Sequence, residues 1–150
     1  MHIFLTGPLQ SGKSTAIARY LAGRPEAPGG FRTHWDRAGG HLALELLETG
    51  ETLTVATMEP HGVRADRAAF DAAGERLLSA PVGRRSLLLM DELGFLERCS
   101  PVFQRAVFTL LDGPTPVLGV LRPHEKSPFW GPVSRRADVR LLPLTVENRA

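Results

Sequence analysis

Residues 7–15 are Gly7-Pro8-Leu9-Gln10-Ser11-Gly12-Lys13-Ser14-Thr15, which match the phosphate-binding pattern G-x-x-x-x-G-K-[ST]. An apolar run at residues 2–6 precedes the match, and an amphipathic pattern over residues 13–22 follows it. The loop therefore lies between a predicted strand and a predicted helix, where successive backbone N–H groups can bind phosphate oxygens. We predict that all the residues of this loop contribute to a nucleotide-binding site.

Particular residues of the loop have separate roles. Gly7 and Gly12 let the backbone turn and approach the phosphates without a Cβ atom in the way. Lys13 places a cation against the β- and γ-phosphates, and the Ser14 hydroxyl is expected to ligate Mg²⁺. Only one other lysine occurs in the chain, at residue 126, which suggests a specific requirement for an ammonium group in the loop.

An acidic pair, Asp91-Glu92, directly follows the apolar run at residues 86–90, which we predict to be a central strand buried on both faces. Acidic residues at the carboxyl end of such a strand hold the metal in phosphate-loop proteins. Asp91 is therefore predicted to bind Mg²⁺ together with Ser14. A second carboxylate can orient a water molecule and accept its proton, so Glu92 is predicted to be the general base. The alternative is that the pair belongs to an ordinary solvated loop.

The rest of the chain follows an α/β pattern with one irregular region. Segments at residues 29–37 and 41–47 flank a Gly-Gly turn, and residues 52–58 alternate, so this region is predicted to be antiparallel. Ser100 is the predicted N-cap of a later helix. The further elements we predict are helices at 66–80 and 101–112, strands at 116–121 and 139–145, and a proline-rich loop at 122–137 with room for a short helix.

The composition is that of one soluble globular domain spanning residues 1–150. Eighteen Lys and Arg against sixteen Asp and Glu give a formal charge of +2, too weak to imply nucleic acid, although a pI of about 9.2 is compatible with it. Cys99 is the only cysteine, so no intrachain disulfide can form. The sequence contains neither a signal peptide nor an apolar stretch approaching about 18 residues, so we expect a cytoplasmic protein without a membrane partner.

These motifs resemble those of the small P-loop nucleoside-triphosphatase family, the group that includes the cancer-related nucleoside-triphosphatase. Residues 30–37 contain Gly-Phe-x-Thr and a trailing Arg37, similar to a hairpin of that family. Residues 91–97, Asp-Glu-Leu-Gly-Phe-Leu-Glu, look like its Asp-Glu-Ile-Gly-x-Met-Glu signature. Residues 145–149, Thr-Val-Glu-Asn-Arg, look like its closing Thr-x-Glu-Asn-Arg.

The resemblance implies a three-layer, RecA-like P-loop fold with a mostly parallel central sheet, to which this chain adds an antiparallel hairpin excursion. It also implies Mg²⁺-dependent hydrolysis of nucleoside triphosphates such as ATP and GTP. Lys13, Ser14, Asp91 and Glu92 would take the roles given above.

Three places depart from the family pattern. Leu9-Gln10 replaces Pro-Gly in the loop, Trp35 replaces an acidic residue, and Arg122 replaces a histidine. Arg122 follows a predicted strand, where its guanidinium could stabilise transition-state charge, so we count it among the catalytic candidates. Asn148 is a candidate for hydrogen bonding to the base, although an asparagine so close to the chain end is usually just solvated.

Three other features allow two interpretations each. Arg37 either reaches a phosphate or faces solvent. Glu97 either belongs to the catalytic signature or favours the start of a helix through the helix dipole. The pair Phe129-Trp130 is either a lid or interaction element, or an apolar anchor.

Three functions fit the sequence, and we favour a hydrolase whose substrate is a nucleoside triphosphate and whose nucleophile is a water prepared by Glu92. A small nucleoside or nucleotide kinase would instead use the basic segment at 122–136 as a lid over an acceptor. A nucleotide-dependent switch with slow hydrolysis would use residues 29–58 and Phe129-Trp130 to bind a protein partner, which the sequence does not identify.

Overall fold

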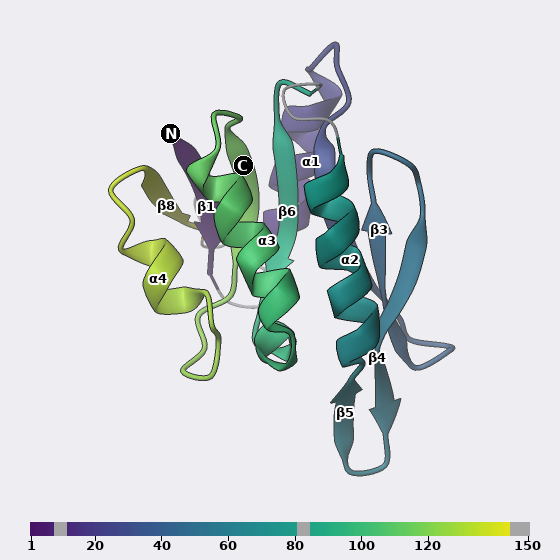
Figure 1. Cartoon of the computed structure of the whole chain (residues 1–150). Helices are drawn as coiled ribbons and strands as arrows, with labels where there is room; N and C mark the ends of the chain where they lie inside the picture. Colours follow the sequence, from purple (N-terminus) through teal and green to yellow (C-terminus); the bar gives the residue numbers. More distant parts are fainter. Residues whose placement is uncertain (8–11, 81–84, 145–150) are drawn as a thin grey trace.

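A computed structural model describes residues 1–7, 12–80 and 85–144 of the chain (Figure 1). Strands dominate the first half, and helices alternate with strands in the second. The elements in chain order are β1 (His2–Thr6), α1 (Lys13–Ala22), β2 (Gly29–Asp36), β3 (His41–Leu46), β4 (Thr52–Glu59), β5 (Gly62–Ala65), α2 (Arg67–Ser79), β6 (Leu88–Leu93), the 3₁₀ turn η1 (Leu96–Cys99), α3 (Pro101–Asp112), β7 (Val117–Leu121), α4 (Trp130–Ser134) and β8 (Val139–Pro143).

One eight-stranded sheet organises these elements, in the order β5-β4-β3-β2-β6-β7-β1-β8. The five neighbouring strands from β2 to β8 in this order run parallel. The other three strands, β3, β4 and β5, extend the sheet as antiparallel neighbours. The predicted α/β fold, mostly parallel with an antiparallel excursion, is therefore confirmed.

Helices cover both faces of the sheet, which gives the three predicted layers (Figure 1). In this view α2 and α3 lie in front of the sheet and α1 lies behind it. Ile17 of α1 packs with Leu89 of β6 in one buried cluster, whereas Phe70 of α2 and Phe103 of α3 belong to the larger cluster on the other face. The central strands β1, β6 and β7 are largely buried, which agrees with the apolar runs from which they were predicted.

The starts of α2 and α3 are held together beside the carboxyl end of the sheet. The Ser100 hydroxyl accepts a hydrogen bond from the backbone N–H of Phe103 at 3.0 Å and donates one to Asp71 of α2 at 2.5 Å. Farther along α2, Gly74 lies so close to α3 that a Cβ atom there would come within 2.9 Å of the Phe103 Cα. The predicted Ser100 cap is confirmed, and it also links the two helices.

The predicted end of the central strand is wrong. Instead of ending with the apolar run at residue 90, β6 continues through the acidic pair to Leu93. Asp91 still pairs with Arg32 of β2 and with Val120 of β7, because backbone pairing does not depend on the polarity of the side chain. The acidic pair therefore belongs to a strand, and the alternative of a solvated loop is wrong as well.

β5 is absent from the predicted elements. It has four residues, Gly62–Ala65, and forms the edge of the sheet beside β4. Most of it is exposed, so its sequence carries no alternation of apolar and polar residues.

The burial of Phe129 and Trp130 decides between the two interpretations of this pair. Phe129 is fully buried, with its ring centroid 5.8 Å from that of Phe108, and Trp130 packs against the same cluster at the start of α4. This pair is therefore an apolar anchor. No helix in the described ranges has the length and apolar character needed to cross a lipid bilayer.

Candidate active site

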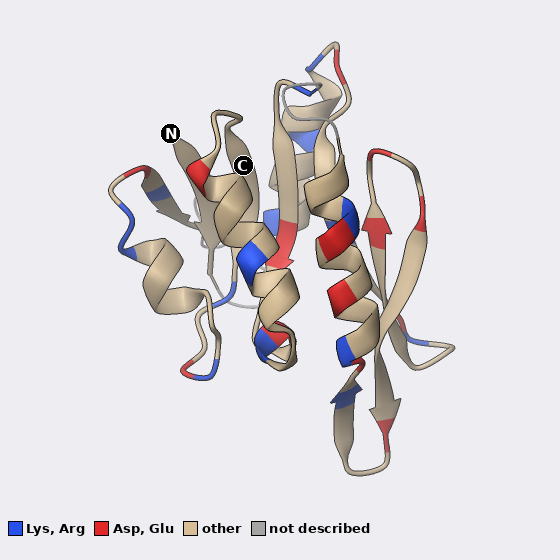
Figure 2. Cartoon of the chain, in the orientation of Figure 1, with Lys and Arg blue, Asp and Glu red and all other residues tan. Residues whose placement is uncertain are grey.

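The candidate residues gather at the carboxyl end of the parallel strands. Asp91 and Glu92 lie near the end of β6, where Figure 2 shows the only acidic segment of that strand in red. Arg122 directly follows β7, and its backbone N–H donates to the Leu93 carbonyl at 3.0 Å. Lys13 begins α1, after the loop that follows β1. Because β1, β7 and β6 are adjacent, the sheet brings these three groups to one place.

The described part of the phosphate loop has the predicted backbone character. Gly7 has a φ of 150° and Gly12 a φ of 92°, values that L-residues with side chains rarely adopt. The Lys13 ammonium donates a hydrogen bond to the Gly7 carbonyl at 3.1 Å. The predicted ligand residues Pro8, Leu9, Gln10, Ser11 and Asn148 lie outside the described residues.

One cavity of about 540 Å³ joins both predicted metal ligands and two of the predicted catalytic residues, and Lys13 is not among its lining residues. Ser14, Asp91, Glu92 and Arg122 all line it. The cavity continues past the acidic pair toward the hairpin formed by β2 and β3, and Arg37 also lines it. The other lining residues are Phe31, Thr33, Trp35, Leu42, Leu44, Val63, Phe70, Gly94, Phe95, Leu96, Glu97 and Phe103.

The electrostatics place Lys13 among these charges. Partial burial lowers the pKa of the Lys13 ammonium, Glu92 and Asp91 raise it, and Arg122 lowers it further. Charges change one another's pKa in this way only when they lie near one another. Lys13 therefore lies near the acidic pair of β6, and its role in phosphate binding stays a prediction.

Burial also raises the pKa of both carboxyl groups of the pair. For Asp91, the nearby cations Arg32 and Lys13 counteract that rise. For Glu92, Arg122 and Lys13 counteract it, whereas the charge of Asp91 adds to it. A desolvated carboxylate with a raised pKa is a stronger base than one in water, which suits proton abstraction.

Thr33, for which the sequence predicts no role, holds the backbone of the acidic pair. Its hydroxyl accepts a hydrogen bond from the Glu92 N–H at 3.3 Å and donates one to the Asp91 carbonyl at 3.2 Å. The Gly-Phe-x-Thr pattern at residues 30–33 was the available signal, and it indicates a hairpin but not this contact. Thr33 extends past the residues of β2 that pair with β6, so its side chain replaces the missing backbone partners.

Glu97 is a buried carboxyl group at the wall of the same cavity. Only 6% of it is exposed, and its Oε2 accepts a hydrogen bond from the Gly94 N–H at 2.6 Å. Burial raises its pKa to about 7, with a further contribution from the charge of Glu92, although the hydrogen bonds from Gly94 and its own N–H oppose this. Glu97 is the second residue of the 3₁₀ turn η1, but it is buried in the wall of the cavity and does not lie on a solvated helix end.

The guanidinium group of Arg122 lies over an aromatic ring, that of Phe95. Its guanidinium carbon lies 5.7 Å from the centroid of the Phe95 ring, which stacks on His124 at 4.3 Å. Arg98 also lies over Phe95, at 5.8 Å, but it does not line the cavity. The aromatic ring therefore has two cations nearby, of which Arg122 alone lines the space beside the acidic pair.

A statistical model of the NTPase family matches residues 2–150. The chain belongs to the NTPase family. Among curated relatives, the nucleoside-triphosphatase THEP1 of Thermofilum pendens is 29% identical, over 99% of this chain and 88% of that protein. The human cancer-related nucleoside-triphosphatase is also 29% identical, over 99% of this chain and 90% of that protein. The predicted family and class of enzyme, a nucleoside-triphosphatase, are confirmed.

The fold is shared with a solved structure. The crystal structure of THEP1 from the hyperthermophile Aquifex aeolicus superposes with a TM-score of 0.78 at 22% sequence identity. The match covers 99% of this chain and 92% of the other. At this identity the likeness establishes the fold, and the roles of individual residues must be argued from this chain.

The residues present fit Mg²⁺. Ser14 offers a hydroxyl oxygen and Asp91 a carboxylate on the wall of one cavity. Mg²⁺ in nucleotide sites is typically held by one or two protein oxygens together with substrate phosphates and water. Within the described residues, no group of three or more His, Cys, Asp or Glu side chains comes together.

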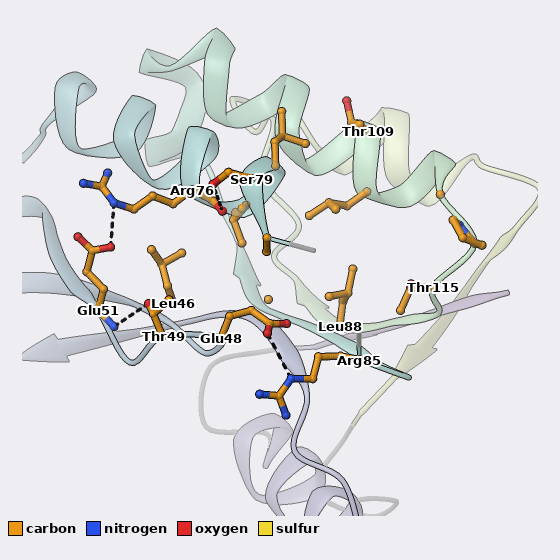
Figure 3. Close-up of a pocket in the computed structure, with 17 residues that line it drawn as sticks. Leu46, Glu48, Thr49, Glu51, Arg76, Ser79, Arg85, Leu88, Thr109 and Thr115 are labelled. Carbon is orange, nitrogen blue, oxygen red and sulfur yellow. Dashed lines mark hydrogen bonds and ion pairs between the residues drawn. The ribbon is translucent and has the colours of Figure 1, made fainter. Parts of the chain in front are cut away.

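A second cavity, of about 530 Å³, lies at the opposite end of the parallel strands, between the ends of α2 and α3 and the start of β6 (Figure 3). Its charged side chains are already paired: Arg85 with Glu48 at 3.2 Å, and Arg76 with Glu51 at 2.8 Å (Figure 3). Among its described lining residues there is none of the predicted site residues. Because ligands of open α/β sheets bind at the carboxyl ends of the strands, the first cavity is the candidate active site of this NTPase-family chain.

Proposed function

We propose that this protein hydrolyses nucleoside triphosphates to the diphosphate and inorganic phosphate, with a water molecule that Glu92 activates. The observation that carries the proposal is the meeting of Ser14, Asp91, Glu92 and Arg122 on one cavity, with Lys13 in electrostatic range of the last three. A hydroxyl, two carboxylates and two cations in one place fit the needs of phosphoryl transfer.

The phosphate loop and Lys13 bind the phosphate tail of the substrate. Backbone N–H groups at the start of α1 and the Lys13 ammonium bind the β- and γ-phosphates. Because Lys13 lies near Asp91 and Glu92, a terminal phosphate held by Lys13 also lies in front of the acidic pair. The substrate is thereby oriented with its terminal phosphate toward β6.

Glu92 abstracts the proton of the attacking water. Its carboxylate accepts a proton from the attacking water as the new oxygen–phosphorus bond forms and the bond to the diphosphate breaks. Thr33 fixes the backbone at Glu92 and so limits the positions that the carboxylate can adopt. Arg122 stabilises the negative charge that develops on the transferred phosphoryl group.

Ser14 and Asp91 would hold Mg²⁺ from one side of the cavity. When bound, this ion supplies positive charge that neutralises the phosphate oxygens. Arg32 and Lys13 favour the ionised form of Asp91, which a metal ligand needs.

Phosphate release from ATP and from GTP, with Mg²⁺ and with EDTA, tests this function. We expect steady release that requires Mg²⁺ and needs no added acceptor. Release that appears only when a nucleoside is added would favour the kinase instead, and release that stays slow until lysate protein is added would favour the switch. No release under any of these conditions would contradict the proposal.

A further inference from the structure

Glu97 is a buried carboxyl group in the wall of the candidate active site that the proposed reaction does not use. Burying such a group is costly unless it has hydrogen-bonding partners. One partner of Glu97 is the backbone N–H of Gly94, which donates to Oε2 at 2.6 Å. The Glu97 carbonyl also accepts a hydrogen bond from the Gln104 side chain of α3 at 3.0 Å. Glu97 is therefore anchored on α3, and its role depends on what Gly94 holds in place.

The backbone of Glu92 receives little support from the sheet. β2 pairs with β6 only as far as Asp91, and β7 pairs with Asp91 and then with Leu93, with a shift of register between them. Glu92 is thus the extra residue of a β-bulge, and it has no register partner in β2 or β7, both of which the structure describes in full. Bulges redirect side chains, so the direction of the Glu92 side chain depends on contacts outside the strand ladder.

These contacts come from both sides of Glu92 along the chain. On the N-terminal side, the Thr33 hydroxyl accepts the Glu92 N–H at 3.3 Å. On the C-terminal side, β6 ends at Leu93, and the next residue, Gly94, is buried. A buried N–H group beyond the end of a strand needs a partner, and the Glu97 carboxylate supplies it.

Two further hydrogen bonds fix the same segment. The Ser127 hydroxyl donates to the Gly94 carbonyl at 2.9 Å. The Arg122 N–H donates to the Leu93 carbonyl at 3.0 Å. The chain that follows the acidic pair is therefore held by three separate parts of the protein, of which Glu97 is the one that binds through a carboxylate.

The carboxylates of Glu92 and Glu97 lie on the same side of Gly94. A Cβ atom at Gly94 would lie 3.7 Å from Oε1 of Glu92 and 3.6 Å from Oε1 of Glu97. The peptide that Glu97 holds is therefore in the immediate surroundings of the proposed general base. A shift of this peptide would move the Glu92 carboxylate relative to the attacking water.

We propose that Glu97 is a positioning residue for hydrolysis, because its carboxylate fixes Gly94 and, together with Thr33, fixes the direction of the Glu92 side chain. Glu97 itself exchanges no proton with the substrate or with the attacking water. The residue after Gly94 is Phe95, whose ring lies 5.7 Å from the guanidinium carbon of Arg122, so the same contact supports that ring. The inference rests on the proposed function, in which Glu92 is the general base.

Two conservative variants separate positioning from a role of the charge. Glu97→Gln removes the charge and keeps an oxygen at the distance needed to accept the Gly94 N–H. Glu97→Asp keeps the charge, but its side chain is one methylene group shorter and reaches the Gly94 nitrogen only if the backbone moves. Positioning therefore predicts that Glu97→Asp is the slower variant, whereas proton transfer through Glu97 predicts that Glu97→Gln is slower.

Single-turnover hydrolysis with Mg²⁺ and ATP or GTP, whichever the native protein hydrolyses faster, measures the chemical step. We expect Glu97→Asp to be slower by about tenfold to 10²-fold, the scale of a small misplacement of a catalytic group, and Glu97→Gln to stay within about threefold of the native rate. A fluorescent-nucleotide titration should give unchanged affinity for both variants. Rates are expressed per nucleotide-binding site, so that any unfolded fraction does not contribute.

Asp66→Ala is the control, because Asp66 also accepts a backbone N–H, that of Ala69 at 3.1 Å, but caps α2 outside the cavity. It should hydrolyse at the native rate. A native rate in Glu97→Asp, or a loss in Glu97→Gln at least as large as in Glu97→Asp, would overturn the inference while leaving hydrolysis in place. Absence of hydrolysis by the native protein would instead overturn the proposed function, and the inference with it.

Discussion

Thr33 on β2 is hydrogen-bonded to the backbone of Glu92 on β6, with 3.3 Å between the Glu92 nitrogen and the Thr33 hydroxyl oxygen. The same hydroxyl donates to the carbonyl of Asp91 at 3.2 Å. A single side chain thus joins the proposed metal ligand and the proposed general base to the neighbouring strand.

Replacing Thr33 with valine keeps the shape of the side chain and removes the hydroxyl. Two modest hydrogen bonds are lost at the pair, so we expect phosphate release about threefold to tenfold slower. The affinity for the nucleotide should change little, because Thr33 does not belong to the loop. Steady-state kinetics and nucleotide titration measure the two effects. Thr57→Val, on the exposed side of β4, is the control. Loss of affinity at an unchanged rate would argue against a positioning role.

Lys13→Ala should abolish detectable binding of the Mg²⁺–nucleotide complex, because the ammonium is the proposed partner of the β- and γ-phosphates. The chain offers a matched control in Lys126→Ala, since residue 126 is exposed and carries the only other lysine. Fluorescent-nucleotide titration of both variants makes the comparison. Similar nucleotide affinities of the two variants would show that Lys13 does not bind the phosphates.

Arg122→Ala should slow hydrolysis by about 10²-fold, the usual scale for removing a group that stabilises transition-state charge. Arg98→Ala tests whether the effect belongs to the site, because Arg98 shares the Phe95 ring but does not line the cavity. Single-turnover hydrolysis separates the chemical step from binding. Equal rates for the two variants would mean that Arg122 has no part in the chemistry.

Glu97 should make the folded state less stable as the pH rises. Burial raises its folded pKa from 4.5 to about 7, so between these values the folded state binds more protons than the unfolded state. Stability from this group is present below pH 4.5 and is lost as the pH rises through 7, with an upper bound of about 3 kcal/mol. Glu97→Gln cannot titrate, so relative to the native protein it should be more stable at alkaline pH than at acid pH. Urea unfolding across this range measures the difference, and parallel stability curves would contradict the account.

Much of the fold follows from patterns that lie within single segments. The apolar run before the loop, the Ser100 cap and the Gly-Gly turn after residue 37 each specify a local structure, and each prediction is confirmed. β5 could not be found in this way, because an exposed four-residue edge strand is stabilised by pairing with β4 and not by its own sequence.

The candidate site could be predicted only where a motif names the residue type. The acidic pair and Lys13 could be singled out because their spacing and context are specific, and the structure places their charges near one another. Their roles stay predictions. The contact from Thr33 and the burial of Glu97 depend on how β2, β6 and η1 meet in space.

The central claim is that Glu92 activates the attacking water in a site that binds the nucleotide without its help. Hydrolysis and nucleotide affinity measured side by side in Glu92→Gln test it most directly. The account predicts that the variant binds the Mg²⁺–nucleotide complex about as tightly as the native protein and hydrolyses it at least about 10²-fold more slowly. Hydrolysis at the native rate would contradict it.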